Sequence, residues 1–185
     1  MDWKQYLLNL EHKEQWDDAI EYMQFIIESD PNDMNAYIYM NFLIMNLLVE
    51  EDYDESKHDY YAALLKKYFD ESYAKFSNNA EYLFCTGITA IMSEWHFGIT
   101  VDDNQKMLKR AMELDSDNIL YKDIYYLHLD KNVPNQLNEV LDYARLILQD
   151  DSVLVKLRDT HGAFGEYFYI ITSGWAKRIL RENSK

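Results

Sequence analysis

The chain has 185 residues, of which 48% are apolar and 15% are aromatic, so it can bury the core of one domain and is not a disordered acidic tail. Only 5 Gly and 2 Pro are present, too few for the many turns of a β-sandwich or barrel, and long helices are therefore expected. The formal net charge of −15 disfavours contact with nucleic acid and with anionic membranes.

The negative charge is concentrated in the first half of the chain. Residues 1–100 hold 19 acidic and 6 basic side chains, whereas residues 101–185 hold 14 and 12. Such a field attracts basic proteins and speeds their association. A second interpretation stays open, in which the acidity only keeps a tyrosine-rich protein soluble.

The chain shows no sign of a targeting or membrane segment. Its first residues lack the basic region and apolar core of a signal peptide. The longest apolar stretch, from Ala36 to Val49, is interrupted by Asn41 and Asn46 and is shorter than the ~20 residues that span a bilayer. We therefore expect a soluble, cytoplasmic protein.

Apolar residues recur at helical spacing along almost the whole chain. Breakers and capping residues divide this pattern into helices that we expect at 2–12, 15–29, 34–49, 53–76, 79–94, 103–114, 118–129, 134–149, 152–158 and 163–182. Residues 95–101 are expected to form a loop, with Asp102 or Asp103 capping the next helix. Gly162 and Gly165 mark a further break.

The stretch from Trp16 to Asp33 has the pattern of the second half of a tetratricopeptide repeat. Ala19 stands where the second helix of such a repeat has its alanine, Met23 stands where it has a large residue, and Pro31 closes the unit. Over this stretch the chain resembles the tetratricopeptide-repeat family. The resemblance implies a scaffold that binds other proteins.

Endings like the one at Pro31 recur at Ser77 and Ser116, with spacings of 46 and 39 residues in place of the family's regular repeat length. We therefore expect an all-α, tetratricopeptide-like helical-hairpin solenoid of about three to four irregular repeats. Its single domain, 1–185, would comprise repeats at roughly 1–33, 34–79, 80–118 and 119–150 and a C-terminal cap at 151–185.

No residue pattern predicts catalysis. The five histidines lack the one-turn spacing of a zinc helix, and Cys85 falls on an apolar helical face, where a structural thiol is expected. The acidic run from Glu50 to Glu55 lacks the central glycine of a calcium loop and is expected to be a solvated turn. We expect no enzyme activity, no catalytic residue, no cofactor and no metal.

The resemblance implies that a partner binds in a concave groove lined by the first helices of successive repeats. The predicted partner contacts are Glu11, His12, Asn35, Ile38, Phe42, Glu81 and Phe84 in this groove, and Glu50, Glu51, Asp52, Asp54 and Glu55 in the acidic run beside it. Core packing is the alternative for the apolar members, including Phe42 and the neighbouring groove positions Met45 and Ile88.

Two classes of function fit these observations. The first is a module that binds and neutralises a basic protein, as immunity proteins do against nuclease-like toxin domains. The second is a cytoplasmic chaperone or adaptor that holds an extended peptide of a secreted protein in the groove. The charge favours the first, so the expected partner is a basic protein, either a toxin domain or a secreted client, and neither nucleic acid nor membrane.

Overall fold

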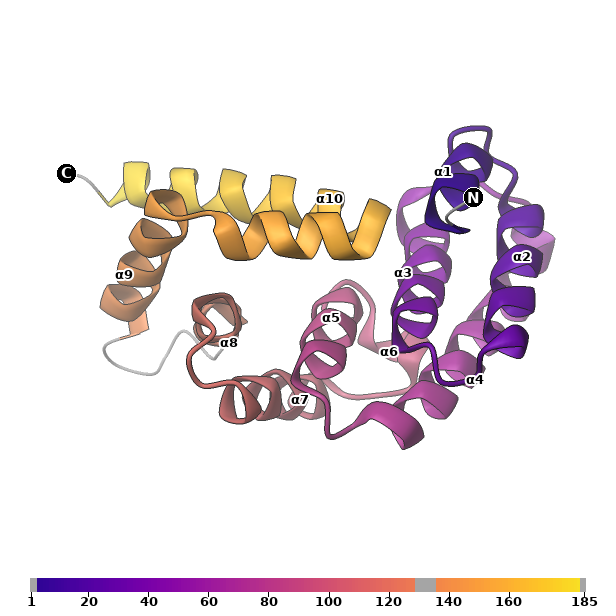
Figure 1. Ribbon diagram of the computed structural model, residues 1–185, viewed down its shortest axis with the longest axis horizontal. Helices are drawn as coiled ribbons and strands as arrows, with labels where there is room; N and C mark the ends of the chain where they lie inside the picture. Colours follow the sequence, from indigo (N-terminus) through magenta and orange to yellow (C-terminus); the bar gives the residue numbers. More distant parts are fainter. Residues whose placement is uncertain (1–2, 129–135, 184–185) are drawn as a thin grey trace.

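The computed structural model describes residues 3–128 and 136–183, and within these ranges the chain is helical and contains no strand (Figure 1). The helices are α1 (Trp3–Glu11), α2 (Trp16–Ser29), α3 (Met34–Glu50), the 3₁₀ turn η1 (Glu55–Lys57), α4 (His58–Phe76), α5 (Ala80–Ala90), α6 (Glu94–Phe97), α7 (Val101–Leu114), α8 (Ile119–His128), α9 (Gln136–Gln149) and α10 (Ser152–Glu182). The predicted all-α, tetratricopeptide-like class is confirmed.

Helices that are near one another in the chain pack as helical hairpins, in one case with the one-turn helix α6 between them. α1 packs on α2, α3 on α4, α5 on α7, and α8 on α9, while contacts between α3 and α5 join two of these hairpins. The hairpins form an arc, and α10 spans its open side from α9 to α1 and α3 (Figure 1). The division into repeats with the boundaries given above stays a prediction.

α3 is the most enclosed helix because α2, α4, α5 and α10 all pack against it. This enclosure explains its long apolar sequence. Asn41, which interrupts the apolar run, is buried and donates from Nδ2 to Ser72 Oγ at 3.3 Å. Among the residues that the structure describes, no helix is long and apolar enough to cross a membrane.

α10 is itself a hairpin of two helical arms, 152–161 and 163–182. The chain reverses at Gly162, whose φ of 55° and ψ of −128° lie outside the helical region. The break predicted at Gly162 is therefore confirmed, but the helix continues through Gly165. A Cβ atom at Gly165 would lie 2.5 Å from the Leu157 carbonyl oxygen, so a residue without a side chain lets the two arms approach.

Side chains also hold the two arms of α10 together. Arg158 on the first arm lies 4.0 Å from the Glu166 carboxylate on the second, and its guanidinium lies 5.2 Å from the centre of the Tyr169 ring. The Tyr169 hydroxyl donates to Asp151 Oδ2 at 3.0 Å. The second arm therefore returns along the first.

The expected loop at 95–101 is wrong in part, because it contains the end of the one-turn helix α6. Phe97 is fully buried and packs edge-on against Phe69, with ring centres 5.4 Å apart, which fixes this turn to α4. Gly98, with φ of 69°, ends it. The next helix is capped by Thr100, whose side chain accepts from the Asp103 N–H, and Asp103 completes the capping box without being the cap itself.

Candidate functional site

The α10 hairpin lies in the groove formed by the inner helices of the arc. Its tip is held by His161, which is 2% exposed and whose Nε2 lies 2.8 Å from Glu81 Oε1 on α5. The Lys4 ammonium on α1 donates to the Thr160 carbonyl oxygen. These polar contacts tie the tip to helices far away in the sequence.

Aromatic rings continue the same contact along α10. Phe164 packs against Phe42 on α3 with ring centres 5.3 Å apart, and Phe168 packs against Phe84 on α5 at 5.7 Å. Phe84 in turn lies 4.3 Å from the Tyr121 ring on α8. The chain's own C-terminal helices therefore fill much of the groove that the family resemblance implies for a partner.

This arrangement corrects the proposed role of two predicted contacts. Ile38 is 1% exposed and Phe84 is 0% exposed, so both belong to the core and neither offers a surface to a partner. Phe42 is also largely buried, as the core-packing alternative expected, although one edge of it borders two cavities beside α10.

The first of these cavities lies between α1, α3 and α10, has a volume of about 970 Å³, and is called the acidic cavity below. Its carboxylates are Glu11, Glu50, Glu51, Asp159 and Glu166, and its other lining residues include Lys4, His12, Trp16, Phe42, Arg158 and Tyr167. Both cations have internal partners, since Lys4 donates to Thr160 and Arg158 lies 3.0 Å from Asp159.

Glu11 is the most perturbed acid of the acidic cavity. Burial raises the pKa of its carboxyl from the ordinary 4.5 to about 7, the Tyr39 hydroxyl opposes the shift, and the charge of Glu51 adds to it. Within the described part of the chain, Glu11 Oε1 and the neighbouring Trp16 Nε1 are buried without a hydrogen-bond partner. A cation that entered here would supply a partner for Glu11 Oε1.

We expect Glu11→Gln to stabilise the protein above pH 7. Because the pKa of Glu11 is higher in the folded than in the unfolded state, its contribution is complete below about pH 4.5 and is lost as the pH rises to about 7. The loss is on the order of 3 kcal/mol, since one pKa unit corresponds to about 1.4 kcal/mol. Urea unfolding of both proteins from pH 4 to pH 8 measures it.

A second buried acid will keep part of this pH dependence in the variant. Burial alone raises the pKa of Asp123 to about 7, in the same direction as for Glu11. The Glu11→Gln protein should therefore still lose some stability as the pH rises. Parallel pH profiles for the wild type and the variant would contradict the assigned environment of Glu11.

The remaining predicted contacts lie outside the acidic cavity. Asp52, Asp54 and Glu55 are exposed on the turn before α4, where Asp54 accepts the Ser56 N–H at 3.0 Å and caps η1. Asn35 is half-buried near the start of α3. The structure therefore brings together Glu11, His12, Phe42, Glu50 and Glu51 from the predicted set, and it adds Asp159 and Glu166 from α10.

Glu81, another predicted contact, is engaged with α10. We expect Glu81→Ala to cost about 1–3 kcal/mol, because it leaves the buried His161 ring nitrogen without its acceptor. Glu81→Gln retains an acceptor oxygen and should lose less. Urea unfolding at neutral pH compares the two variants, and equal stability of both with the wild type would contradict the contact.

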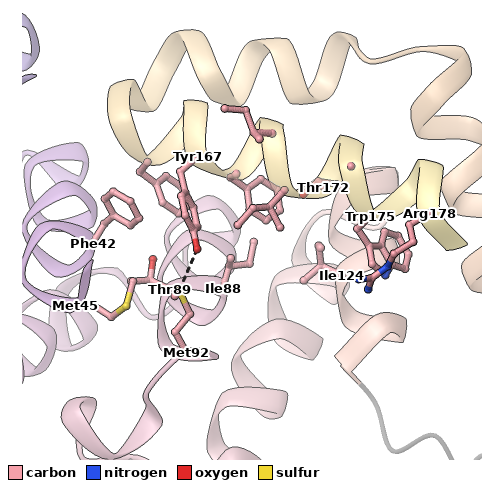
Figure 2. Close-up of a pocket in the computed structure, with 15 residues that line it drawn as sticks. Phe42, Met45, Ile88, Thr89, Met92, Ile124, Tyr167, Thr172, Trp175 and Arg178 are labelled. Carbon is pink, nitrogen blue, oxygen red and sulfur yellow. Dashed lines mark hydrogen bonds between the residues drawn. The ribbon is translucent and has the colours of Figure 1, made fainter. Parts of the chain in front are cut away.

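The second cavity has a volume of about 490 Å³ and is called the apolar cavity below (Figure 2). It lies between the second arm of α10 and the inner helices, and its lining residues include Phe42, Met45, Ile88, Thr89, Met92, Ile124, Tyr167, Ile171, Thr172, Gly174, Trp175 and Arg178. Phe42, Tyr167 and Ile170 line both cavities and so separate them.

The described side chains hold no group of three or more His, Cys, Asp or Glu residues arranged to bind a metal ion. Cys85 is buried beside His161, with 3.9 Å between Sγ and Nε2, and burial raises the pKa of its thiol well above the usual value. A thiol in this setting is protonated and unreactive. It therefore suits the structural role predicted from the sequence.

Comparison with known proteins identifies the fold. No protein-family model and no curated protein matches the chain. Among solved structures, the chain is similar to the crystal structure of MamA protein, with a TM-score of 0.50 and 12% sequence identity over 99% of this chain and 91% of that one. MamA is a tetratricopeptide-like helical repeat protein, so this similarity supports the same fold for the chain.

Proposed function

We propose that this protein is a protein-binding module whose acidic cavity binds a basic region of its partner. The observation that supports this best is the gathering of five carboxylates around one cavity whose described lining holds two Lys or Arg side chains, Lys4 and Arg158, so that acidic groups remain in excess after Arg158 pairs with Asp159 and Glu166. An excess of negative charge on a concave surface attracts and orients a positively charged partner.

The shape and chemistry of the acidic cavity suit a lysine or arginine side chain. Trp16, Phe42 and Tyr167 offer apolar surface for the aliphatic stem of such a side chain, and the carboxylates surround its charged end. A cation near Glu11 would also favour the ionised carboxylate, so binding should release a proton where Glu11 is still protonated.

The partner that we propose is a nuclease-like toxin domain. Proteins that act on nucleic acid carry basic surfaces, because they must neutralise phosphates. A protein that covers such a surface with carboxylates would block access to nucleic acid. The charge of the acidic cavity is the basis of this proposal. The chain would then be an immunity-type protein that inhibits the nuclease by binding and has no catalytic activity of its own.

Isothermal titration calorimetry with purified basic nuclease domains tests the proposal, beginning with any such domain encoded next to this chain. We expect binding that weakens strongly as the salt concentration rises, together with inhibition of the nuclease in the same mixture. The absence of salt-sensitive binding to every domain in the series would overturn the proposal. A different result would favour the chaperone that holds an extended peptide: binding that does not depend on salt and that is lost in Phe42→Ala. In that case α10 would have to leave the groove to make room for the peptide.

A further inference from the structure

The apolar cavity has the size and lining of a site for a small apolar ligand. Its volume of about 490 Å³ falls in the range of small-molecule sites, and Phe, Met and Ile side chains form most of its wall. In Figure 2 Ile88, Met92 and Ile124 lie on the side of the second arm of α10 that faces the inner helices. The Tyr167 hydroxyl donates to the Met92 sulfur at 3.6 Å, which is a weak acceptor.

A glycine keeps part of the wall of the apolar cavity open. Gly174 lies inside the helical second arm, where glycine is less favourable than alanine. A Cβ atom built at Gly174 would meet no heavy atom within 4 Å, so close packing does not explain the absence of a side chain. Gly174 is exposed and lines the apolar cavity, so a larger side chain at this position would stand at the cavity wall.

Arg178 gives the lining of the apolar cavity a positive charge, and Thr172 adds a buried polar group to it. Thr172 is 2% exposed, and its hydroxyl has no hydrogen-bond partner within the described ranges. Arg178 lies at one end of the labelled side chains in Figure 2, beside Trp175, and it is the charged residue in the lining. An arginine at the end of an apolar groove suits a carboxylate, which it can hold with two hydrogen bonds.

We propose that the apolar cavity binds a single-chain anionic amphiphile, namely a free long-chain carboxylate. Its alkyl chain lies against Ile88, Met92 and Ile171 and passes the open side of Gly174. Its carboxylate lies at Arg178. The inference concerns a different cavity from the proposed protein-binding function and does not depend on it.

Calorimetric titration of the full chain with dodecanoate, with dodecanol and with dodecyltrimethylammonium tests the proposal. We expect dodecanoate to bind most tightly, because it combines the alkyl chain with a negative charge. Gly174→Leu should weaken this binding at least tenfold, because its side chain fills the space, while the Tm of the protein does not fall. Arg178→Gln should weaken the binding of dodecanoate and leave that of dodecanol unchanged.

Arg181→Gln is the matched control, since it removes the same charge from an exposed position of the same arm outside the lining. It should leave dodecanoate binding unchanged. Gly174→Ala adds a smaller side chain and should weaken binding less than Gly174→Leu. The proposal is overturned if dodecanoate does not bind, if Gly174→Leu binds it normally, or if Arg178→Gln and Arg181→Gln have equal effects. If dodecanoate does not bind, the apolar cavity would instead bind apolar side chains of a protein partner.

Discussion

Phe164→Ala is expected to cost about 3–5 kcal/mol of unfolding free energy, the usual range for removal of a buried phenylalanine. The side chain is 1% exposed and lies between Phe42 on α3 and Phe168 on its own arm, with ring centres 5.3 Å and 6.2 Å away. Its removal leaves a void where α10 meets the inner face of the arc. Equilibrium unfolding in urea measures the loss.

Ile170→Ala serves as the control for Phe164→Ala, because Ile170 lies on the same arm and is 60% exposed. Its removal should change the stability by no more than about 0.5 kcal/mol. A loss below about 1 kcal/mol for Phe164→Ala would contradict the packing of α10 in the groove. Such a result would also leave the groove free for a partner.

The second large effect is expected from the combined variant Glu50→Gln, Glu51→Gln and Glu166→Gln. These three carboxylates line the acidic cavity and are exposed enough to reach a partner. Their removal should slow association with the basic partner by roughly tenfold or more at low salt, because electrostatic steering raises such rates by 10- to 1,000-fold. Stopped-flow or surface-based kinetics at two salt concentrations measure this rate.

Glu21→Gln, Glu28→Gln and Asp59→Asn together form a control that changes the net charge by the same amount. These residues are exposed in the same acidic half of the chain but do not line the acidic cavity. Their removal should slow association less than removal of the cavity acids. If both triple variants slowed it equally, the overall charge of the protein would attract the partner, and the acidic cavity would have no special role.

Most helix positions could be predicted from the sequence because they depend on local chemistry. The helices expected at 15–29 and 34–49 occupy Trp16–Ser29 and Met34–Glu50 in the structure. The start of α3 is fixed by Asp33, which accepts the N–H of Asn35 at 2.9 Å. Apolar periodicity and such caps involve residues within one or two turns, and the sequence displays both directly.

The candidate site was harder to predict because it depends on where α10 lies. Gly162 indicates a break, but its φ of 55° and the direction in which the second arm leaves follow from packing against distant helices. That packing buries Phe84, which the repeat pattern places in the groove, and brings Asp159 and Glu166 beside Glu11. A single sequence contains no local signal for contacts between residues so far apart.

The structural similarity to a tetratricopeptide-like protein concerns the fold, and the proposed function depends on the chain's own residues. Both cavities border α10, one rich in carboxylates and the other apolar. The α10 hairpin occupies the groove and has an acidic cavity and an apolar cavity beside it. This arrangement would allow two different ligands to bind separately. The triple acidic variant and Gly174→Leu should therefore affect different ligands.

Hydrogen–deuterium exchange of the complex with a basic nuclease domain tests most directly whether the partner binds at the acidic cavity while α10 stays in the groove. We expect slower exchange at the end of α1 near Glu11, at the end of α3 near Glu50 and around Glu166, with unchanged exchange over residues 172–182, which lie outside the lining of the acidic cavity. Faster exchange over residues 172–182, together with protection of α5 near Ile88, would show that the partner displaces α10 and would contradict the account.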